Sequence, residues 1–161
     1  MKKTRCLSGL ILFALLFPVC MTAYADAGAL DLSKGQTVYV PAYSHIYVGN
    51  RERPFLLTIT LSIRNIDAKN PVTITAADYY DTKGKRIRKY LEQPVSLGPW
   101  ESIRYIVPQK DKSGGSGANF VVEWSAEKGV NPVLVETIMI GAESQQGISF
   151  TSRGQAISTA P

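Results

Sequence analysis

The chain has 161 residues, with 18 basic and 13 acidic side chains and a formal net charge of +5. Lys2, Lys3 and Arg5 lie in an N-terminal segment that we expect to be removed, which leaves 15 basic against 13 acidic residues and a net charge of +2. So small a charge gives no basis for binding nucleic acid, and we expect no nucleic-acid partner. Cys6 and Cys20 lie in the same segment, so the mature chain has no disulfide.

Residues 1–25 have the three parts of a secretory signal peptide. Positive charges precede an apolar run over residues 7–21, and Ala23 and Ala25 supply the small side chains that signal peptidase requires. We therefore expect cleavage between Ala25 and Asp26, and a periplasmic or secreted protein.

Two alternatives concern the same apolar run. An uncleaved membrane anchor needs roughly 20 apolar residues, and this run is shorter and contains Pro18. A lipoprotein would be acylated at Cys20, but the preceding Val19 is bulky where a small residue is required. We expect neither a transmembrane span in the mature chain nor a lipid anchor.

Cleavage leaves 136 of the 161 residues, a length typical of one domain. A chain of this size buries roughly two thirds of its unfolded surface, which is enough to fold without disulfides. We divide it into a flexible N-terminus (26–34), a folded domain (35–154) and a frayed tail (155–161).

Short segments with alternating side chains follow one another along this chain. Residues 57–64 alternate apolar and polar side chains, which predicts a strand buried on one face. Asp81 and Gly84 are typical of the first and fourth positions of a type I turn. This turn predicts a hairpin between residues 72–80 and residues 85–90.

Residues 133–140 are almost continuously apolar, which predicts a central strand buried on both faces. No segment has the spacing of an amphipathic helix. The chain therefore predicts an all-β fold, a two-sheet antiparallel sandwich of seven to nine short strands with an immunoglobulin-like arrangement, and a small barrel is the alternative. The remaining expected strands are 37–40, 44–47, 94–97, 102–107, 120–124 and 148–153.

Several short motifs occur together in this chain. They include Tyr-Ser-His-Ile-Tyr at 43–47, Asp-Tyr-Tyr-Asp at 78–81, Ser-Gly-Gly-Ser-Gly-Ala-Asn-Phe at 113–120, and Gln-Gly-Ile-Ser-Phe at 146–150. As a set they resemble a bacterial family of exported proteins that is known only as a domain of unknown function. The resemblance covers residues 35–157 and implies no activity, ligand or catalytic residue.

The glycine-rich segment at 113–119 is one candidate site. Its backbone N–H groups could bind a phosphate, but the lysine of a P-loop is missing and a strand follows instead of a helix. A nucleophile elbow also needs a helix after its serine. The alternatives are a structural loop and a loop that binds a ligand or partner. The candidate residues are Gly114, Gly115, Ser116, Gly117 and Asn119.

His45 is the sole histidine, and serine hydrolases usually need a histidine base. Ser44 is its neighbour, but adjacent residues of a strand point to opposite faces, so we expect no Ser44–His45 pair. A distant serine such as Ser116 could approach it instead. The structural alternative is a histidine hydrogen-bonded between Tyr43 and Tyr47, and these three aromatic residues are candidates for an interaction site.

One histidine and no mature cysteine argue against a zinc site, and no EF-hand loop is present for calcium. We therefore expect no metal and no cofactor.

Residues 83–89 carry five positive charges, among them Lys85, Arg86 and Arg88. They could bind an anionic polymer, lipid headgroups or an acidic partner, or they could form a solvated hairpin tip that prevents edge-to-edge aggregation. Trp100 lies in a turn, where it could anchor an interface or fold back onto the domain.

From these patterns we expect a non-catalytic interaction or assembly module of the bacterial envelope, whose partner is an envelope protein or ligand. The alternative is a binder of a small ligand or anionic envelope polymer through the glycine-rich segment or the basic hairpin. A hydrolase that uses His45 is a third hypothesis.

Overall fold

The computed structural model describes residues 31–50, 52–143 and 146–159. The expected signal peptide and its cleavage site lie outside the described residues. The described ranges contain strands, turns and bends but no helix, and hence no helix that could cross a membrane. The strands are β1 (Ser33–Pro41), β2 (His45–Tyr47), β3 (Pro54–Leu56), β4 (Thr58–Arg64), β5 (Val72–Tyr80), β6 (Arg86–Lys89), β7 (Val95–Leu97), β8 (Ser102–Val107), β9 (Asn119–Val130), β10 (Leu134–Glu143), β11 (Gln146–Arg153) and β12 (Gln155–Thr159).

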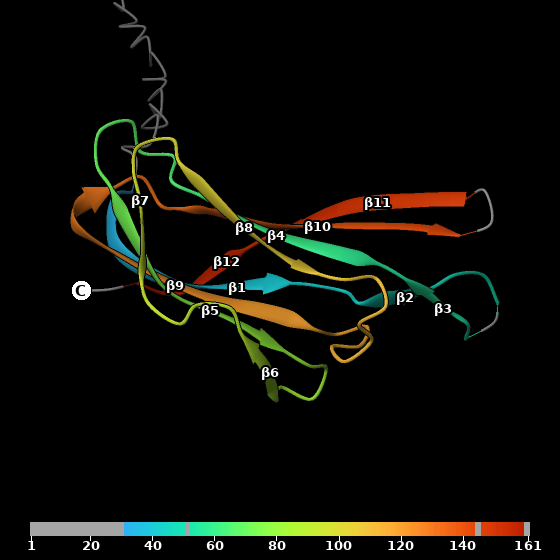
Figure 1. The fold of residues 1–161 in the computed structure, drawn as a ribbon. Coiled ribbons are helices and arrows are strands. Elements are labelled where there is room, and N and C mark those ends of the chain that lie inside the picture. The colour runs from blue at the N-terminus through green and yellow to red at the C-terminus, as the bar shows by residue number, and fades with distance from the viewer. Residues whose placement is uncertain (1–30, 51, 144–145, 160–161) are drawn as a thin grey trace, which may run out of the picture.

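These strands form two large antiparallel sheets and one small one. The six-stranded sheet has the order β12-β1-β9-β5-β6, with β7 also paired to β5, and the four-stranded sheet has the order β11-β10-β4-β8. Figure 1 shows the two large sheets as two layers, with the β2–β3 pair at one end. The all-β, antiparallel expectation is confirmed, whereas the expected count of seven to nine strands is wrong because the described residues form twelve.

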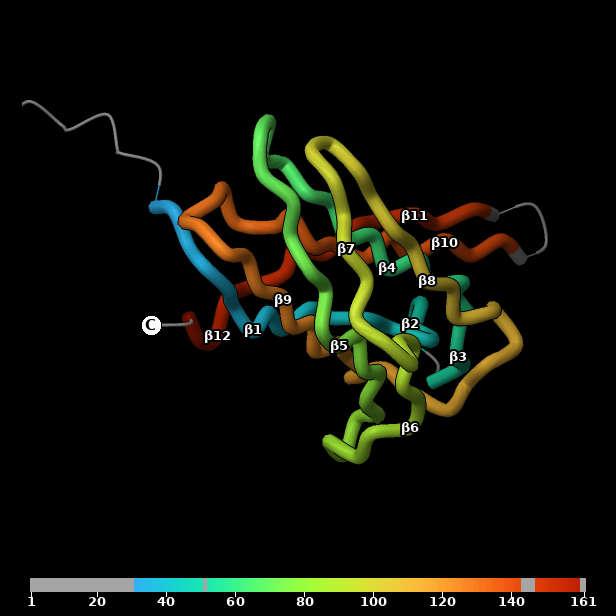
Figure 2. The backbone as a smooth tube through the Cα atoms, turned by 60° about the vertical axis from the view of Figure 1, so that its left-hand side comes forward, coloured from blue at the N-terminus to red at the C-terminus, as the bar shows by residue number. Residues whose placement is uncertain are grey.

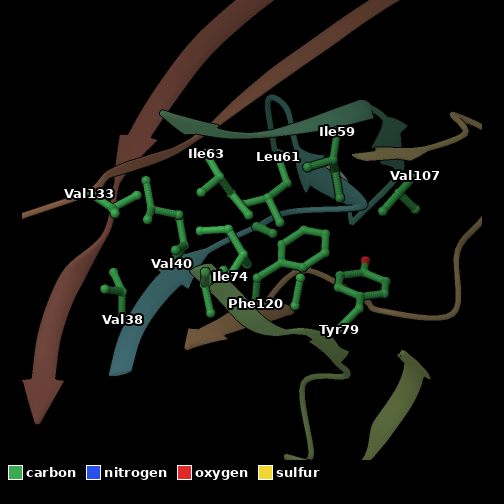
Figure 3. Packing of buried hydrophobic residues seen from close by; sticks show 14 of the residues in the cluster. Val38, Val40, Ile59, Leu61, Ile63, Ile74, Tyr79, Val107, Phe120 and Val133 are labelled. Atoms are coloured by element: carbon green, nitrogen blue, oxygen red, sulfur yellow. The ribbon is translucent and has the colours of Figure 1, made fainter. Parts of the chain in front are cut away.

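The core lies between the two layers and follows from the alternation along β4. Ile59, Leu61 and Ile63 are fully buried on one face of β4. Their partners come from the facing sheet and include Val40 of β1 and Phe120 of β9, which are also fully buried. Figure 3 shows these side chains meeting between the sheets. The chain needs no disulfide because this apolar layer is continuous.

The β5–β6 hairpin forms as its turn residues predict. Gly84 has a φ of +77°, and its N–H donates to the carbonyl oxygen of Asp81 at 2.9 Å. The Asp81 carboxylate accepts from the N–H groups of Lys83 and Lys85, both at 2.9 Å. Local hydrogen bonds of this kind fix a turn without help from distant residues.

The strand expected at 133–140 is central, since β10 lies between β11 and β4, but it is not buried on both faces. Val135, Thr137 and Met139 are buried, whereas Ile140 is 53% exposed. The prediction was wrong because the outward side chains of β10 lie on the open face of the four-stranded sheet.

The tail expected to be frayed forms β12, which pairs with β1 from Gln36↔Thr159 to Tyr39↔Gln155. Gly154 makes this possible by letting the chain cross from one sheet to the other. Its N–H donates to the Val135 carbonyl at 2.8 Å, and a Cβ at this position would lie 2.6 Å from a Val38 methyl carbon. The prediction of a frayed tail was wrong because β12 pairs with β1, a strand at the other end of the sequence.

Candidate functional site

The glycine-rich loop before β9 is held by two hydroxyl groups from distant segments. The Gly115 N–H donates to Ser44 Oγ at 2.9 Å, and the Gly117 N–H donates to Thr82 Oγ1 at 3.0 Å. The Thr82 hydroxyl donates in turn to the Gly114 carbonyl at 3.0 Å. Two of the N–H groups that a phosphate would need are therefore already used within the protein.

Close packing explains why this loop is rich in glycine. A Cβ at Gly114 would overlap the hydroxyl of Tyr79 and lie 2.6 Å from its ring carbon Cζ and 2.7 Å from Ala118 Cβ. Gly115 has a φ of +82°, a conformation that other residues rarely adopt. Ser116 is partly exposed in this loop, and Asn119 begins β9 opposite Pro41. The geometry therefore favours a structural role for the glycines.

Ser44 and His45 form a pair, contrary to the sequence-based expectation. Ser44 Oγ and His45 Nδ1 are 3.3 Å apart. The alternation of a strand does not apply here, because Ser44 lies in a bend and β2 begins only at His45. Ser44 is fully buried, and its hydroxyl also lies 3.1 Å from the Gly115 carbonyl oxygen, which it can donate to.

The other two aromatic candidates, Tyr43 and Tyr47, have different neighbours. His45 Nε2 lies 3.4 Å from the Tyr47 hydroxyl, and the two rings meet edge to face at 5.4 Å between centroids. Tyr43 packs instead on Phe150 of β11, at 5.9 Å. His45 therefore has Tyr47 as its partner, but it does not lie between Tyr43 and Tyr47 as expected.

The two arginines of the basic hairpin form ion pairs with carboxylates of the domain. Arg86 binds the Asp78 carboxylate at 2.8 Å, and this hydrogen bond raises the pKa of the Arg86 guanidinium. Arg88 lies 3.4 Å from the Asp111 carboxylate and 5.4 Å from the centre of the Tyr90 ring. The lysines of this hairpin, including Lys85, are exposed.

Trp100 is 69% exposed and has a φ of +63°. It occupies the third position of the turn between β7 and β8, which the Glu101 N–H closes by donating to the Gly98 carbonyl at 3.1 Å. Figure 1 places this turn at the opposite end of the sandwich from the glycine-rich loop. The candidate residues therefore do not form one site, although Ser44 and Thr82 connect the His45 region and the hairpin turn to the glycine-rich loop.

An open groove outside these candidates lies on the outer face of the four-stranded sheet. It has a volume of about 760 Å³. Figure 2 shows β4, β8 and β10, which supply its walls. The lining residues are Thr60, Ser62, Arg64, Ser102, Ile103, Arg104, Tyr105, Ile106 and Ile138.

Cationic side chains gather at one end of this face. The register places Arg104 opposite Ser62, Ser62 opposite Glu136, and Glu136 opposite Arg153, in one row across four strands. Arg64 Nε lies 3.7 Å from the Glu136 carboxylate. Glu136 therefore lies beside Arg64 and Arg153, and Arg104 lies one strand further along the same row, so three arginines outnumber one glutamate at this end of the face.

The other end of the same face is apolar. Ile106 is 49% exposed and Ile140 is 53% exposed. Sequence reasoning missed this face, although the polar alternation at Thr60, Ser62 and Arg64 was visible. The sequence does not show which strands pair, and the face forms only because β4 pairs with β8 and β10, which lie far from it in the chain.

Among residues 31–50, 52–143 and 146–159, no cluster of His, Cys, Asp or Glu side chains is arranged to hold a metal ion. No match was found among curated proteins. The structure titled "Crystal Structure of Thermotoga maritima 1070" is similar at a TM-score of 0.45 and 12% identity, covering 78% of this chain and 97% of that chain. Residues 35–157 match the family model described as "Protein of unknown function (DUF3124)". The chain therefore belongs to the DUF3124 family.

Proposed function

We propose that this protein is a non-catalytic interaction module of the bacterial envelope, and that it binds a partner protein on the outer face of the four-stranded sheet. The observation that carries the proposal is the exposure of Ile106, which lines one open groove together with Arg64 and Arg104, and of Ile140 further along the same face. Exposed apolar side chains bordered by arginine are typical of surfaces that other proteins cover.

The form of the groove favours a macromolecular partner over a small ligand. All of its lining residues belong to β4, β8 and β10, so an occupant is contacted from one side. Sites for small molecules bury most of the ligand surface instead. A protein segment can cover the face without being enclosed.

The surroundings of Ser44 support the non-catalytic part of the proposal. A nucleophile must reach its substrate, whereas the Ser44 side chain is fully buried and bonds the Gly115 backbone. The hydrolase hypothesis retains a direct test, because a hydrolase that uses His45 as its base would lose activity in His45→Ala while remaining folded.

An extracytoplasmic location is part of the proposal. It is supported by the charged start of the chain, the apolar run at 7–21 and Ala23 and Ala25, and by the absence of cysteine after position 20. Mass spectrometry of the protein from its own host tests it. A mass that begins at Asp26 would agree with the proposal, and an intact N-terminus would contradict it.

We also propose an immunoglobulin-like relationship for the sandwich. The pairs β4–β8 and β5–β9 correspond to the B–E and C–F pairs of that fold. The outer positions are exchanged, because β1 lies beside β9 and β10 lies beside β4. An experimental structure with other neighbours for β4 and β9 would overturn this assignment.

Site-specific photocrosslinking in the living host tests the interaction. A photoreactive residue at Arg104 or Ile140 should yield an adduct with the same partner polypeptide, identified by mass spectrometry. The same residue at Glu123, which is exposed on the six-stranded sheet, should not. Equal labelling at all three positions, or none at Arg104 and Ile140, would refute a partner on this face.

A second candidate is binding of an anionic polymer through the basic hairpin, which the exposed Lys83, Lys85 and Lys89 favour. No ion pair to these lysines occurs within the part of the chain that the structure describes. Loss of polymer binding in Lys85→Glu, with the Arg104 adduct retained, would favour this candidate.

A further inference from the structure

We infer that the partner presents an extended acidic segment, which adds to the free edge of β8 as a fifth strand of the four-stranded sheet. This inference rests on the proposed function, because it names the form of the partner at the same face. Three observations carry it: the position of β8 in the sheet, the direction of its backbone groups, and the charge beside it.

β8 is the last strand of its sheet, with β4 on one side only. The Tyr90 hydroxyl donates to the Ile106 carbonyl at 3.4 Å, so this carbonyl points away from β4. In an antiparallel pair, alternate residues direct both backbone groups to the same side. Ser102 and Arg104 therefore direct their N–H and C=O groups to the same edge. These groups are the ones left for an added strand, because the Ile106 carbonyl already accepts from Tyr90.

The same three residues place their side chains on the outer face. Their register partners on β4 are Arg64, Ser62 and Thr60. A strand that bonds to this edge would bring its own outward side chains next to Arg104 and Ile106, at the groove of about 760 Å³. Backbone pairing and side-chain recognition would then occur together, as in other cases of strand addition.

Charge determines which segment fits. Arg104 faces Ser62 across β4, and within the described ranges no carboxylate forms an ion pair with it. A carboxylate opposite Arg104 on the incoming strand would supply that partner. Ile106 lies two residues further along the same face, so the segment should carry an acidic and an apolar residue two positions apart.

The two outer strands of the six-stranded sheet, β6 and β12, fit this role less well. On β6, Arg86 and Arg88 already bind Asp78 and Asp111. β12 has no charged side chain, and its pairing with β1 contains an irregularity next to Thr37. A cation on an edge strand opposes pairing with a second copy of the same chain, so Arg104 favours an acidic partner over self-association.

The test uses the mature chain and a labelled synthetic peptide. In this peptide, glutamate and isoleucine occupy alternate outward positions separated by threonine, and binding is followed by fluorescence anisotropy. We expect saturable binding, and no binding of a matched peptide with lysine in place of glutamate. Equal binding of the two peptides, or binding of neither, would overturn the inference.

Two variants at one position separate charge from backbone pairing. Arg104→Ala removes the charge, and Arg104→Pro also removes the N–H that points to the free edge, where proline is tolerated. We expect Arg104→Ala to weaken peptide binding several-fold and Arg104→Pro to weaken it by about a further tenfold. Lys85→Glu, on the hairpin, should bind as the unaltered chain does.

Peptides methylated on their backbone amides test strand addition with the unaltered protein. This test therefore does not depend on whether Arg104→Pro folds. In strand addition, alternate amides of the peptide donate to β8. Methylating one alternate set should therefore abolish binding, and methylating the other should not. Equal effects of both sets would overturn strand addition. If the partner still crosslinks at Arg104 and Ile140 in that case, the proposed function stands, whereas absence of those adducts refutes the proposed function itself.

Discussion

The hydroxyl of Ser44 holds both polar groups of the Gly115 backbone. Its Oγ accepts from the Gly115 N–H at 2.9 Å and lies 3.1 Å from the Gly115 carbonyl, which also accepts from the Ser44 N–H at 3.1 Å. These bonds join the bend before β2 to a loop 71 residues further along the chain. The two segments should therefore lose order together when Ser44 is altered.

Ser44→Ala is expected to destabilise the domain by about 1–3 kcal/mol, because it leaves the Gly115 N–H without its acceptor in a partly buried loop. Chemical denaturation measures the change in the free energy of unfolding. Ser96→Ala, at an exposed position, is the matched control and should have little effect. A stability equal to that of the unaltered chain would show that water replaces the Ser44 hydroxyl at no cost.

Gly114→Ala should cost about 1–3 kcal/mol, because the added methyl group overlaps the Tyr79 hydroxyl beneath the loop. That hydroxyl is buried and has no hydrogen-bond partner among the described residues, so Tyr79→Phe alone should be nearly neutral. Burial raises the pKa of Tyr79, in keeping with a phenol that stays protonated.

The double variant Gly114→Ala/Tyr79→Phe separates the steric overlap with the Tyr79 hydroxyl from other effects. Tyr79→Phe should recover part of the stability lost in Gly114→Ala, with the remaining loss due to the contacts with the ring carbon Cζ and with Ala118. A thermodynamic cycle from denaturation curves measures this coupling. Strictly additive losses would mean that the loop moves away from Tyr79 rather than packing against it.

The features that could be predicted from the sequence are those determined locally. The turn at Asp81–Gly84 depends on hydrogen bonds within five residues, and the buried face of β4 follows from its own alternation. The pairing of β12 with β1 depends on Gly154 and on residues at the other end of the chain, so no local pattern indicates it.

The candidate site was predictable to a smaller extent, for the same reason. Turn residues predict the turn that contains Trp100, and charge predicts the basic hairpin, although the exposure of Trp100 was left open by the sequence. The row Arg104–Ser62–Glu136–Arg153 cannot be predicted in this way, because each member belongs to a different strand and strand order determines that they are neighbours. The bend at Ser44 also interrupts an apparently continuous strand, which is why the contact with His45 was not expected.

Asp67 makes stability depend on pH in the acid range. Hydrogen bonds from the N–H groups of Lys69, Asn131 and Asn70 lower its pKa from the ordinary value of 3.8 to about 2. Because the folded-state pKa is the lower one, its contribution to stability is complete above the unfolded-state value and is lost as pH falls towards about 2. The free energy of unfolding should therefore decrease between about pH 4 and pH 2.

Asp67→Asn tests this assignment. The variant should be less stable than the unaltered chain at neutral pH, and its free energy of unfolding should change less between about pH 4 and pH 2. Glu92→Gln, at an exposed position, should keep the original pH dependence. If Asp67→Asn also keeps that dependence, other carboxylates are responsible for the loss of stability in acid.

Trp100 occupies a turn position that favours glycine. Its φ of +63° follows Pro99, and a positive φ at the third position is the mark of a type II turn. Trp100→Gly should raise stability by about 0.5–1 kcal/mol, because relief of the left-handed conformation exceeds the added entropy of the unfolded chain. Gly84→Ala, at a φ of +77°, is the matched control and should lower stability by denaturation. A loss of stability in Trp100→Gly would show that the indole ring, although 69% exposed, packs on the domain strongly enough to hold the strained turn.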